Sequence, residues 1–542
     1  MNDSHAATSH VVLPRDVLRA FEDIVGPEHV SDDPWILDGY SFYFLSELIT
    51  ALGAGGERKF IPRPSAVLLP GSTEEVQRIV RVCNRRQIQF HAFSTGVVCE
   101  GGAGRVQLDL RRMNRIVDID EKNRIAVIEP YVTNARLFHA TIKKGLRAHV
   151  HAAGANTSPL ASATSVGGEG PDNPSCGYSS RNVLGVEWVL PSGELLRLGS
   201  LGSGAGWFSG DGPGPSLRGV MRGVFGAFGG LGVFTRVAVK LYPWHGPPVF
   251  KGHGLPPNYP GEMPTNMKAF FAGFPTPDQM YDAVGLVWEE GIAHTFNRMP
   301  RSFLCYASSE SNQQAYELWQ SGLLEREFSN GISMIIAGFS EAERAYKERV
   351  FHEILRKTGG KIAETLQNDP RFALGVLRTS VLSDGVFRAV SRPSGGILEG
   401  YYLNESVDVS RLSHEASYAH TKSFTDRGIC IDNGETNWGT FSDIAYLSEQ
   451  IPHFDPRDEK SVQGMLELLA TSYQKQFETR SGAGLFANIG ALMNDAFGPM
   501  LSNVHIWKKR IKRGLDPRTA CDPMGYAFPE APTATEPPPE RG

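Results

Sequence analysis

Apolar and polar residues recur with two different periods in the first third of the chain. Residues 72–75 read STEE, which is a capping box, and apolar residues then follow at the i, i+3, i+4 and i+7 spacing of a helix up to Arg86. Apolar and polar residues alternate over 88–92, which predicts a half-buried strand. A hairpin is predicted at 116–128 and a helix at 134–144, so strands and helices follow one another closely.

A glycine-rich turn at 93–110 lies between two of these predicted strands. Gly96, Gly101, Gly102 and Gly104 allow positive φ, so backbone N–H groups can approach a ligand closely. Successive N–H groups in such a turn form a concave site for an anion. No helix follows at once, which excludes a P-loop and a Rossmann turn. Two interpretations stay open at this point: a phosphate cradle and a glycine-rich surface loop.

The region that follows is again rich in glycine. The run ATSVGG at 163–168 offers little side-chain bulk where a backbone could approach a ligand. Strands are predicted at 183–190 and 195–198, with the turn PSGE between them. A helix predicted at 218–228 carries basic residues that face either an anion or solvent.

Residues 268–360 contain an internal repeat. One copy reads KAFFAGF and the other ISMIIAGF, and helix-start residues follow each at once, PTPD in the first copy and SEAE in the second. Both copies continue through an amphipathic helix to a glycine and a further strand. Two strand–helix–strand units of this kind predict a ferredoxin-like α+β sheet.

The stretch beyond the repeat is less regular. A strand is predicted at 397–403, a helix at 410–427 and a short strand at 429–432. Residues 433–443 read NGETNWGTFSD, which predicts a polar loop with an aromatic residue, Trp438, suited to the wall of a pocket. A solvated loop is the alternative.

Four motifs in the first half keep the order and spacing of a known family. They are RPSAVLLPGSTEEVQRIVRVCNRRQIQFHAFSTG from 63, ATSVGG from 163, NVLGVEWVLPSGELLRLG from 182 and FGGLGVFTRVAVKL from 228. Together they resemble the FAD-binding domain of the vanillyl-alcohol oxidase / p-cresol methylhydroxylase superfamily over roughly 62–245. The run HIWKKRIKRGLDPRTACDP at 505–523 resembles the closing helix and turn of glycolate oxidase and D-lactate dehydrogenase subunits, where it returns to the flavin domain.

This resemblance implies FAD as the cofactor, with the glycine-rich turn around its pyrophosphate. Val97, Val98, Cys99 and Glu100 stand where the family usually has small or polar residues. The cofactor-binding candidates are Ser94, Thr95, Gly96, Val97, Val98, Cys99, Gly101, Gly102, Ser162, Thr164, Ser165, Gly167, Gly168, Tyr178, Gly232 and Val233.

In this superfamily a second domain, the cap, covers the flavin, and it is expected here at 246–480. The catalytic candidates lie mostly in this cap. Arg392 in a predicted turn suits a substrate anion, because a guanidinium binds a carboxylate through two hydrogen bonds, but a surface arginine is the alternative. Tyr401 and Tyr402 point to opposite faces of a strand, so only one of them can face the flavin. The candidates are Arg392, Tyr402, Glu435 and His505. The metal-dependent D-2-hydroxyacid branch of the superfamily carries an H-x-H pair in its cap, whereas the only such spacing here, at 149–151, lies in the predicted flavin domain, so the resemblance implies no metal.

Composition limits the partners. The chain of 542 residues has a net charge of −5 and no basic cluster that would suit nucleic acid. No apolar run is long enough to cross a membrane, and the N-terminal residues lack the apolar core of a signal peptide. Six scattered cysteines fit a reducing cytoplasm. The expected partners are a small-molecule substrate, an electron-acceptor protein or subunit, and further copies of the chain in a homo-oligomer.

The expected fold is α+β, with a two-subdomain p-cresol-methylhydroxylase-type FAD-binding domain and a ferredoxin-like α+β cap domain. The expected divisions are a helical segment at 1–61, the FAD-binding domain at 62–245, the cap at 246–480, a return to the FAD domain at 481–526 and a disordered tail at 527–542.

The expected function is an FAD-dependent oxidoreductase that dehydrogenates a small alcohol, hydroxy acid or phenol. Two alternatives stay open. One is a non-redox flavoenzyme of the alkyl-dihydroxyacetone-phosphate synthase type. The other is a flavin-poor structural subunit of a larger complex, which the unusual residues 97–100 would suit.

Overall fold

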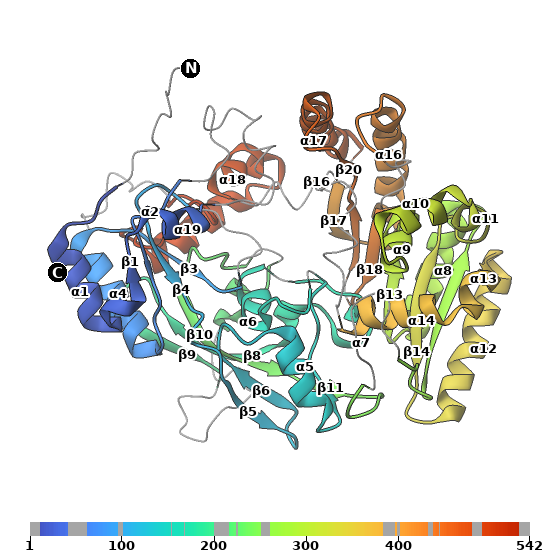
Figure 1. Cartoon of the computed structure of the whole chain (residues 1–542), viewed down its shortest axis with the longest axis horizontal. Helices are drawn as coiled ribbons and strands as arrows, with labels where there is room; N and C mark the ends of the chain where they lie inside the picture. The colour runs from blue at the N-terminus through green and yellow to red at the C-terminus, as the bar shows by residue number, and fades with distance from the viewer. Residues whose placement is uncertain are drawn as a thin grey trace.

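The chain folds into two lobes, seen in the computed structural model in Figure 1. The first lobe (blue to teal, with the red α18 and α19) holds the N-terminal half and the C-terminal segment. The cap lobe (green to orange) holds the middle of the chain. The structure describes residues 11–41, 62–95, 101–152, 154–166, 168–199, 216–223, 226–250, 261–382, 396–397, 401–431, 437–443, 445–479 and 490–529.

A small sheet with the order β1-β2-β4-β3 opens the first lobe. Its strands β2, β4 and β3 run parallel, and β1 is antiparallel to β2. The capping box at Ser72 forms as predicted, since Ser72 Oγ accepts from Glu75 N at 3.1 Å. The apolar sides of helices α1 and α4 pack on this sheet. These elements are β1 (Val30–Ser31), β2 (Ala66–Leu68), β3 (Phe90–Phe93), β4 (Val106–Asp109), α1 (Arg15–Val25), α2 (Pro34–Gly39) and α4 (Thr73–Arg86).

A five-stranded antiparallel sheet with the order β5-β6-β10-β8-β9 forms the second part of this lobe. The predicted hairpin and the predicted strand pair after it are both confirmed. Trp188, fully buried on β8, stacks on Phe234 of β10 at 4.9 Å between ring centres. The elements are β5 (Ile116–Asp120), β6 (Ile125–Ile128), α5 (Asn134–Ile142), β7 (Leu146–Arg147), α6 (Pro159–Ala161), α7 (Asn173–Cys176), β8 (Val183–Val189), β9 (Leu195–Leu198), β10 (Val233–Lys240) and β11 (Tyr242–Pro243).

The cap lobe is built on one seven-stranded sheet with the order β15-β12-β14-β13-β18-β19-β17. Its first four strands have the order of a ferredoxin-like unit, and each half contributes a strand, a helix and a strand. This confirms the predicted repeat, including both N-caps, Thr276 and Ser340. The elements are β12 (Met267–Gly273), α8 (Pro277–Glu290), β13 (Thr295–Arg298), β14 (Ile332–Ala337), α12 (Glu341–Thr358), β15 (Lys361–Ile362), β17 (Tyr401–Glu405), β18 (Asn437–Phe441) and β19 (Tyr446–Gln450).

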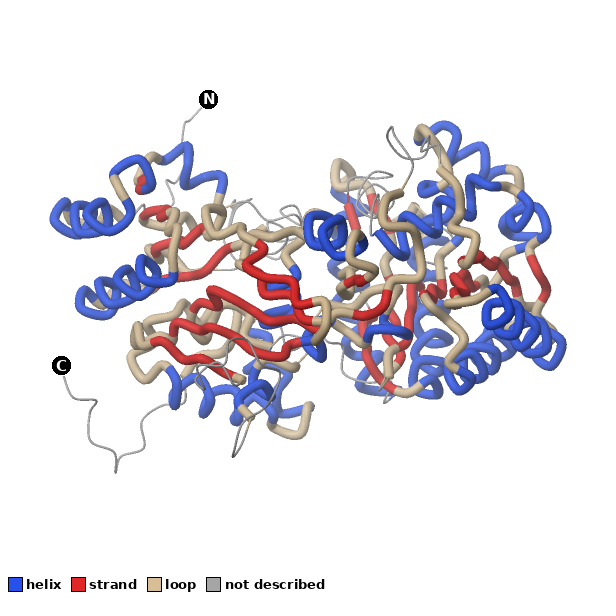
Figure 2. Tube along the Cα trace, turned by 90° about the horizontal axis from the view of Figure 1, so that it is seen from below, coloured by secondary structure: helices blue, strands red, loops and turns tan. Residues whose placement is uncertain are grey.

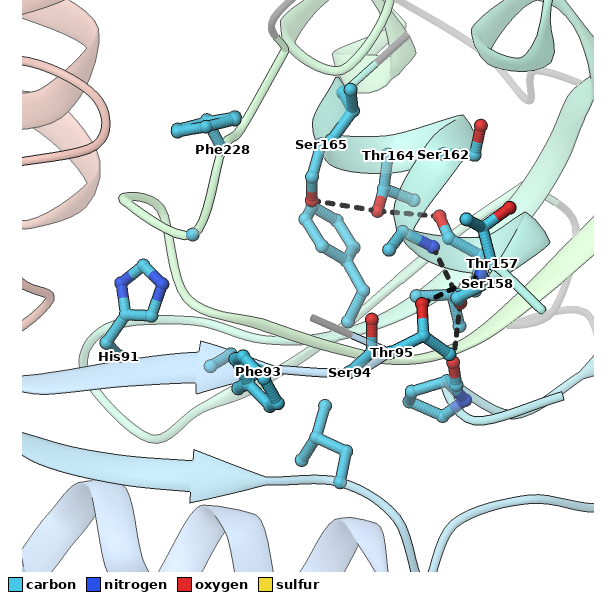
Figure 3. A pocket seen from close by; sticks show the side chains of 18 of the residues that line it. His91, Phe93, Ser94, Thr95, Thr157, Ser158, Ser162, Thr164, Ser165 and Phe228 are labelled. Carbon is cyan, nitrogen blue, oxygen red and sulfur yellow. Dashed lines mark hydrogen bonds between the residues drawn. The ribbon is translucent and has the colours of Figure 1, made fainter. Parts of the chain in front are cut away.

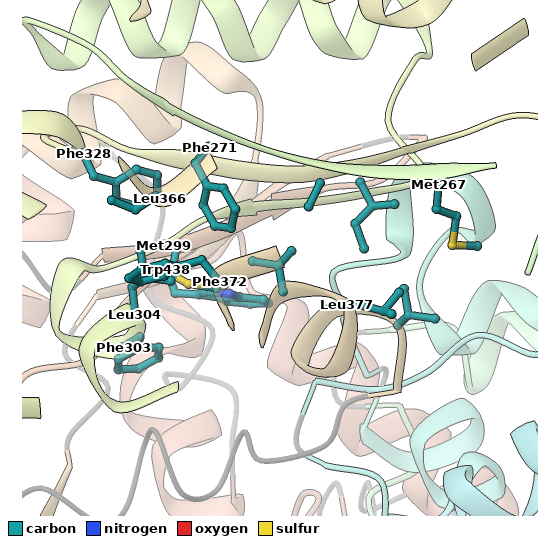
Figure 4. Close-up of a cluster of buried hydrophobic side chains, with 14 of the residues drawn as sticks. Met267, Phe271, Met299, Phe303, Leu304, Phe328, Leu366, Phe372, Leu377 and Trp438 are labelled. Carbon is teal, nitrogen blue, oxygen red and sulfur yellow. The ribbon is translucent and has the colours of Figure 1, made fainter. Parts of the chain in front are cut away.

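The two faces of this sheet carry separate cores. One face packs against α8 and α12 through residues such as Phe270, Tyr281 and Phe351. The other packs against shorter helices, with Phe271, Phe372 and Trp438 in its core (Figure 4). The remaining elements are α9 (Arg301–Ala307), α10 (Asn312–Gln320), α11 (Leu323–Glu327), α13 (Glu364–Asn368), α14 (Pro370–Leu377), β16 (Gly396–Ile397), α16 (Val407–Asp426), β20 (His453–Phe454) and α17 (Glu459–Thr479).

The C-terminal segment lies against the first lobe. It contains α18 (Ala491–Phe497) and α19 (Val504–Leu515), and Ile511 and Leu515 of α19 pack on the core of the five-stranded sheet. Figure 2 shows the two lobes joined end to end. Phe90 N donates to Ala520 O and Asp522 N donates to Phe90 O, so the segment adds a short parallel bridge to β3. Among the described residues, no helix combines the length and the apolarity needed to cross a membrane.

Three local predictions need correction. Residues 437–441, predicted as loop, form the buried strand β18, and Trp438 is 8% exposed. Within the described residues 218–223 and 226–228 of the predicted helix, only a 3₁₀ turn at Leu217–Val220 forms, because three glycines in this stretch weaken a helix. Arg218 does not face solvent, since its side chain is buried and donates to Val183 O and Leu184 O. In the described part of the strand predicted at 429–432, the structure has an isolated bridge from Cys430 to Phe454.

Candidate cofactor site

A cavity of about 150 Å³ lies in the first lobe where its two sheets meet (Figure 3). Three segments far apart in sequence line it: the end of β3, the short helices after residue 156, and the loop before β10. The lining residues are His91, Ala92, Phe93, Ser94, Thr95, Leu110, Pro130, His151, Thr157, Ser158, Leu160, Ala161, Ser162, Thr164, Ser165, Val166, Phe228, Gly229, Gly232 and Phe234.

Hydroxyl groups tie the first two segments together. Ser158 N donates to Thr95 Oγ1 at 3.1 Å, which joins the chain after β3 to the start of α6. Ser158 also caps α6, because its Oγ accepts from Ala161 N at 3.1 Å and donates to Pro130 O. The end of β3 is thereby held against the start of α6.

The residues after α6 place more hydroxyls along the cavity. Residues 162–166 form one turn of π-helix. Ser162 Oγ lies 2.9 Å from Ser179 Oγ, and Thr164 Oγ1 donates to Leu160 O at 3.0 Å. Thr164 Oγ1 also lies 3.2 Å from Ser165 Oγ. Such hydroxyls are neutral and can donate or accept, so they suit a ligand rich in oxygen atoms.

The loop before β10 closes the third side. Gly229 has φ of +72° and Gly232 has φ of +110°, which side-chain-bearing residues rarely adopt. A Cβ at Gly229 would lie 2.7 Å from His91 Cε1, and a Cβ at Gly232 would collide with the Val189 carbonyl oxygen. Both glycines therefore let the wall of the cavity pack closely on neighbouring groups.

The described residues that line the cavity include two histidines and no lysine or arginine. Burial lowers the pKa of His91 to about 4, although the Asp522 carboxylate acts in the opposite direction. Burial and the neighbouring His149 lower the pKa of His151 to about 3. Without a bound ligand, both rings are therefore neutral at pH 7.

A buried ion pair in the C-terminal segment holds the glycine loop. Lys512, with no exposed surface, lies 2.6 Å from Asp516 Oδ2 and donates to Gly230 O at 2.8 Å. The Asp516 carboxylate also accepts from Ala520 N and Cys521 N. Since Gly230 lies between two cavity glycines, the clamp fixes the position of the cavity wall.

A second buried cluster joins the cavity region to the cap lobe. Asp172 lies 2.8 Å from Arg147 NH1 and 2.7 Å from His149 Nδ1. Burial alone would raise the pKa of Asp172, but His149 and Arg147 outweigh it, so its pKa lies below the ordinary value. The adjoining helix α7 contacts the chain just before β13, where Ser175 Oγ donates to His294 O at 2.6 Å.

Six predicted cofactor residues line the cavity: Ser94, Thr95, Ser162, Thr164, Ser165 and Gly232. Gly168, Tyr178 and Val233 lie in the same region, but they are not among the lining residues. Gly168 O is 3.2 Å from His149 Nε2, Tyr178 Oη donates to Arg222 O, and Val233 is buried in β10. Gly96, Val97, Val98, Cys99 and Gly167 lie outside the described residues.

Gly101 and Gly102 have other neighbours than expected. Gly102 N donates to the Asp522 carboxylate at 2.5 Å, so this N–H is already engaged. A Cβ at Gly101 would collide with the Arg105 guanidinium, which is fully buried. Both glycines therefore contact neighbouring side chains, and neither is among the lining residues of the cavity.

The predicted catalytic residues are not brought together among the described residues. Arg392 and Glu435 lie outside them. Tyr402 is on β17, at the edge of the cap sheet, where it pairs with Glu449. His505 begins α19 in the first lobe and packs over Gly498, and it is not among the cavity residues.

Sequence reasoning missed several lining residues, notably His91, Phe93, His151 and Phe228. Alternation along β3 places His91 and Phe93 on the same face, which was a usable signal. Phe228 opens the motif FGGLGVFTRVAVKL, but only long-range packing brings its loop to the cavity. Among the described residues, no group of three or more His, Cys, Asp or Glu side chains could hold a metal ion.

These features fit FAD. The walls combine apolar and aromatic side chains such as Phe93, Leu160 and Phe234 with hydroxyls and close glycine backbone. A flavin nucleotide has flat ring systems joined by a phosphate chain and needs both kinds of contact. A family model described as an FAD binding domain matches residues 64–199, which hold most of the cavity.

Residues 64–199 form an FAD-binding domain. This confirms the predicted cofactor. Over a longer part of its length, the chain is similar to a probable mitochondrial D-lactate dehydrogenase from Danio rerio. The identity is 24% over 473 residues, which cover 85% of this chain and 84% of that protein.

Solved structures extend the similarity to the whole fold. Substrate-bound p-cresol methylhydroxylase has a TM-score of 0.69 at 16% identity, with 94% of this chain and 99% of that chain covered. The 4-ethylphenol oxidase from Gulosibacter chungangensis has a TM-score of 0.71 at 22% identity, with 95% and 97% covered. Alkyldihydroxyacetonephosphate synthase has a TM-score of 0.63 at 15% identity, with 95% and 87% covered. The chain thus has the predicted p-cresol-methylhydroxylase-type fold.

Gly229→Ala is expected to lower the FAD content of the purified protein, because the new methyl group would displace His91 and strain the backbone at φ of +72°. Flavin absorbance per protein measures this directly. Gly219→Ala is the matched control, since no heavy atom lies within 4 Å of its Cβ position. Equal flavin content in the two variants would contradict the assignment of this loop to the cofactor site.

Proposed function

We propose that the protein is an FAD-dependent oxidoreductase that dehydrogenates a small alcohol, hydroxy acid or phenol. The observation that carries the proposal is the cavity in the FAD-binding domain, combined with a complete cap lobe on a p-cresol-methylhydroxylase-type fold. FAD, when bound, supplies the hydride acceptor. One similar protein is named as a probable D-lactate dehydrogenase and another as a 4-ethylphenol oxidase, which supports this range of substrates.

The chain's own residues bind and orient the cofactor. Hydroxyls such as Thr95, Ser162 and Ser165 offer hydrogen bonds along the cavity, and Phe93 and Phe234 exclude water from its walls. The Lys512–Asp516 clamp and the Asp172 cluster keep the two ends of the region in place. Precise positioning is what a protein contributes to cofactor chemistry.

We propose that the cap selects the substrate through Arg392, Tyr402 and Glu435. Arg392 would hold a substrate anion, Tyr402 would donate to its oxygen, and Glu435 would accept its proton. His505, near the start of α19 in the first lobe, is the fourth proposed catalytic residue. The similarity to a probable D-lactate dehydrogenase and to p-cresol methylhydroxylase supports a site for a carboxylate or a phenol group.

Arg392→Ala is expected to lower kcat/KM by roughly 10²-fold, which is the ~2–3 kcal/mol of a hydrogen bond between charged groups. Steady-state kinetics with the substrate found in the screen described below measure the change. Arg371→Ala is the matched control in the same lobe, because the Arg371 side chain is 73% exposed and pairs with Asp369. An unchanged kcat/KM in the Arg392 variant would remove it from the substrate site.

A substrate screen tests the function. The flavin of the purified protein absorbs near ~450 nm, and a substrate bleaches this band when oxygen is absent. D-lactate, glycolate, p-cresol and 4-ethylphenol are the first compounds to add. Bleaching by one of them supports the proposal.

Two alternatives have distinct outcomes in the same screen. A non-redox enzyme, which the similarity to alkyldihydroxyacetonephosphate synthase favours, would hold flavin that none of these compounds bleaches. A flavin-poor structural subunit would show no absorbance near ~450 nm even after addition of FAD.

We also propose that the enzyme works in the cytoplasm as a homo-oligomer and passes electrons to a separate acceptor. The described cysteines are buried, and no disulfide joins any two of them, which suits a reducing compartment; they are Cys83, Cys176, Cys305, Cys430 and Cys521. Exposed aromatic side chains such as Trp35 and Trp507 offer contact surface. Light scattering measures the oligomeric state, and reoxidation of bleached flavin by oxygen, quinone or cytochrome identifies the acceptor.

A further inference from the structure

His91 lines the cofactor cavity and holds a buried ring nitrogen that has no hydrogen-bond partner in the described part of the chain. The residue is 6% exposed and lines the cavity, at the same end as Phe228 in Figure 3. Among the described residues, none hydrogen-bonds to its Nδ1. Gly229 packs against the ring and fixes its position. Buried polar atoms normally have a partner, so this nitrogen marks a place where a ligand atom completes the site.

The charges around His91 are unusual for a site that takes a phosphate. The charged groups that face it are the Asp522 carboxylate and the Arg105 guanidinium. Arg105 donates to Gln107 Oε1, Pro62 O and Gly102 O, so its guanidinium is engaged by protein groups. Asp522, 1% exposed, accepts from Gly102 N and Met524 N. A pyrophosphate entering beside this carboxylate therefore needs a compensating positive charge.

Only two titratable side chains line the described part of the cavity, and their surroundings differ. His151 lies beside His149, which disfavours a positive charge on the His151 ring. His91 lies beside Asp522, which favours a positive charge on the ring. Burial keeps His91 neutral in the absence of a ligand, with a pKa of about 4. An added phosphate raises this pKa, because an opposite charge favours the protonated ring.

We propose that His91 takes up one proton from solvent when FAD binds, and that its imidazolium Nδ1–H donates to a phosphate oxygen of the cofactor. The ring then balances both the phosphate and Asp522. This inference rests on the FAD-binding domain and is independent of the proposed dehydrogenation, since the assay contains no substrate.

The test is calorimetric titration of FAD into the apoprotein, in two buffers of different ionisation enthalpy, from about pH 5.5 to about pH 8. The difference in heat between buffers counts the protons taken up. The pKa of His91 is about 4 in the free protein and higher in the complex. Affinity is therefore expected to fall as pH rises between these two values and to level off above the pKa of the complex.

His91→Gln keeps a hydrogen-bonding side chain but cannot become charged. We expect it to abolish proton uptake and to weaken FAD binding about tenfold near pH 5.5, the loss of one charged hydrogen bond. His139→Gln is the matched control, because His139 is an exposed histidine on α5 and is not among the lining residues of the cavity, and it should keep the proton uptake of the unaltered protein. Asp522→Asn should move the decline in affinity to lower pH, because the pKa of His91 in the complex then falls.

The unaltered protein alone can overturn the proposal. Binding of FAD with no proton uptake across this range would contradict it, whatever the stability of the variants. Equal uptake in His91→Gln and in the unaltered protein would do so too, since another group would then take the proton.

Discussion

Asp172→Asn is expected to lower the free energy of unfolding by about 3–5 kcal/mol, the cost of leaving buried charges without their partner. Asp172 and Arg147 are 1% and 3% exposed, and His149 shares the same carboxylate. An asparagine is neutral, so the guanidinium would remain buried without a compensating charge. Denaturant unfolding of the apoprotein at pH 7, followed by tryptophan fluorescence, measures the change.

The pH dependence gives this expectation a second check. The pKa of Asp172 in the folded protein lies below its ordinary value, so the stability it contributes is present above about pH 4 and is lost as pH falls through the folded pKa. The difference between the variant and the unaltered protein should therefore stay constant from pH 7 down to about pH 4 and shrink only at lower pH.

Asp443→Asn is the matched control for this change. Asp443 also pairs with an arginine, Arg181, at 2.8 Å, but the two side chains are 52% and 38% exposed. Exposed pairs contribute only about 0–1 kcal/mol, because water competes for both charges. Similar losses in the two variants would show that burial of the Asp172 cluster has no special effect.

Lys512→Met is expected to lower the free energy of unfolding by about 3–5 kcal/mol and also to reduce FAD content. Lys512 has no exposed surface, and its removal leaves the Asp516 carboxylate buried without a cation. Gly230 O loses its donor at the same time, so the glycine loop that lines the cavity loosens. Flavin absorbance per protein and denaturant unfolding report the two effects separately.

Lys509→Met on the same helix separates the buried pair from a general effect of removing charge. Lys509 pairs with Asp495 at 2.7 Å, but both side chains keep part of their surface exposed, at 24% and 37%. We expect a loss of at most about 1 kcal/mol and normal FAD content. A Lys512 variant with full flavin content and unchanged stability would show that the clamp does not support the cavity.

Local signals predicted the secondary structure well where short-range chemistry decides it. The Ser72 cap, the repeated Ala-Gly-Phe strands and the caps at Thr276 and Ser340 all involve residues within four positions of each other. The strand at 437–441 was missed because its sequence is polar, although the strand is buried in the cap sheet. Its polar atoms find partners on neighbouring strands, as where Trp438 Nε1 donates to Asn297 Oδ1 at 3.2 Å. Burial supplied by another strand gives no local pattern.

The candidate site was predictable only in part for the same reason. Ser94, Thr95, Ser162 and Thr164 belong to motifs that the sequence shows directly. His91 was not singled out, because its importance depends on Gly229 and Asp522, which approach it only in the folded chain. Gly102 was expected to face a phosphate, yet its N–H is taken by Asp522 from the far end of the sequence.

The bridge between β3 and the C-terminal segment constrains how the protein is made. Gln89 Nε2 donates to Thr519 O at 3.1 Å across 430 positions of sequence, and Phe90 bonds to both Ala520 and Asp522. While the ribosome is still translating the cap, β3 has no neighbour on this side and remains an open strand edge, which invites pairing with other chains. This edge of β3 is therefore covered only after residues 519–522 have been synthesised, and its closure is a slow, long-range step that local contacts do not require.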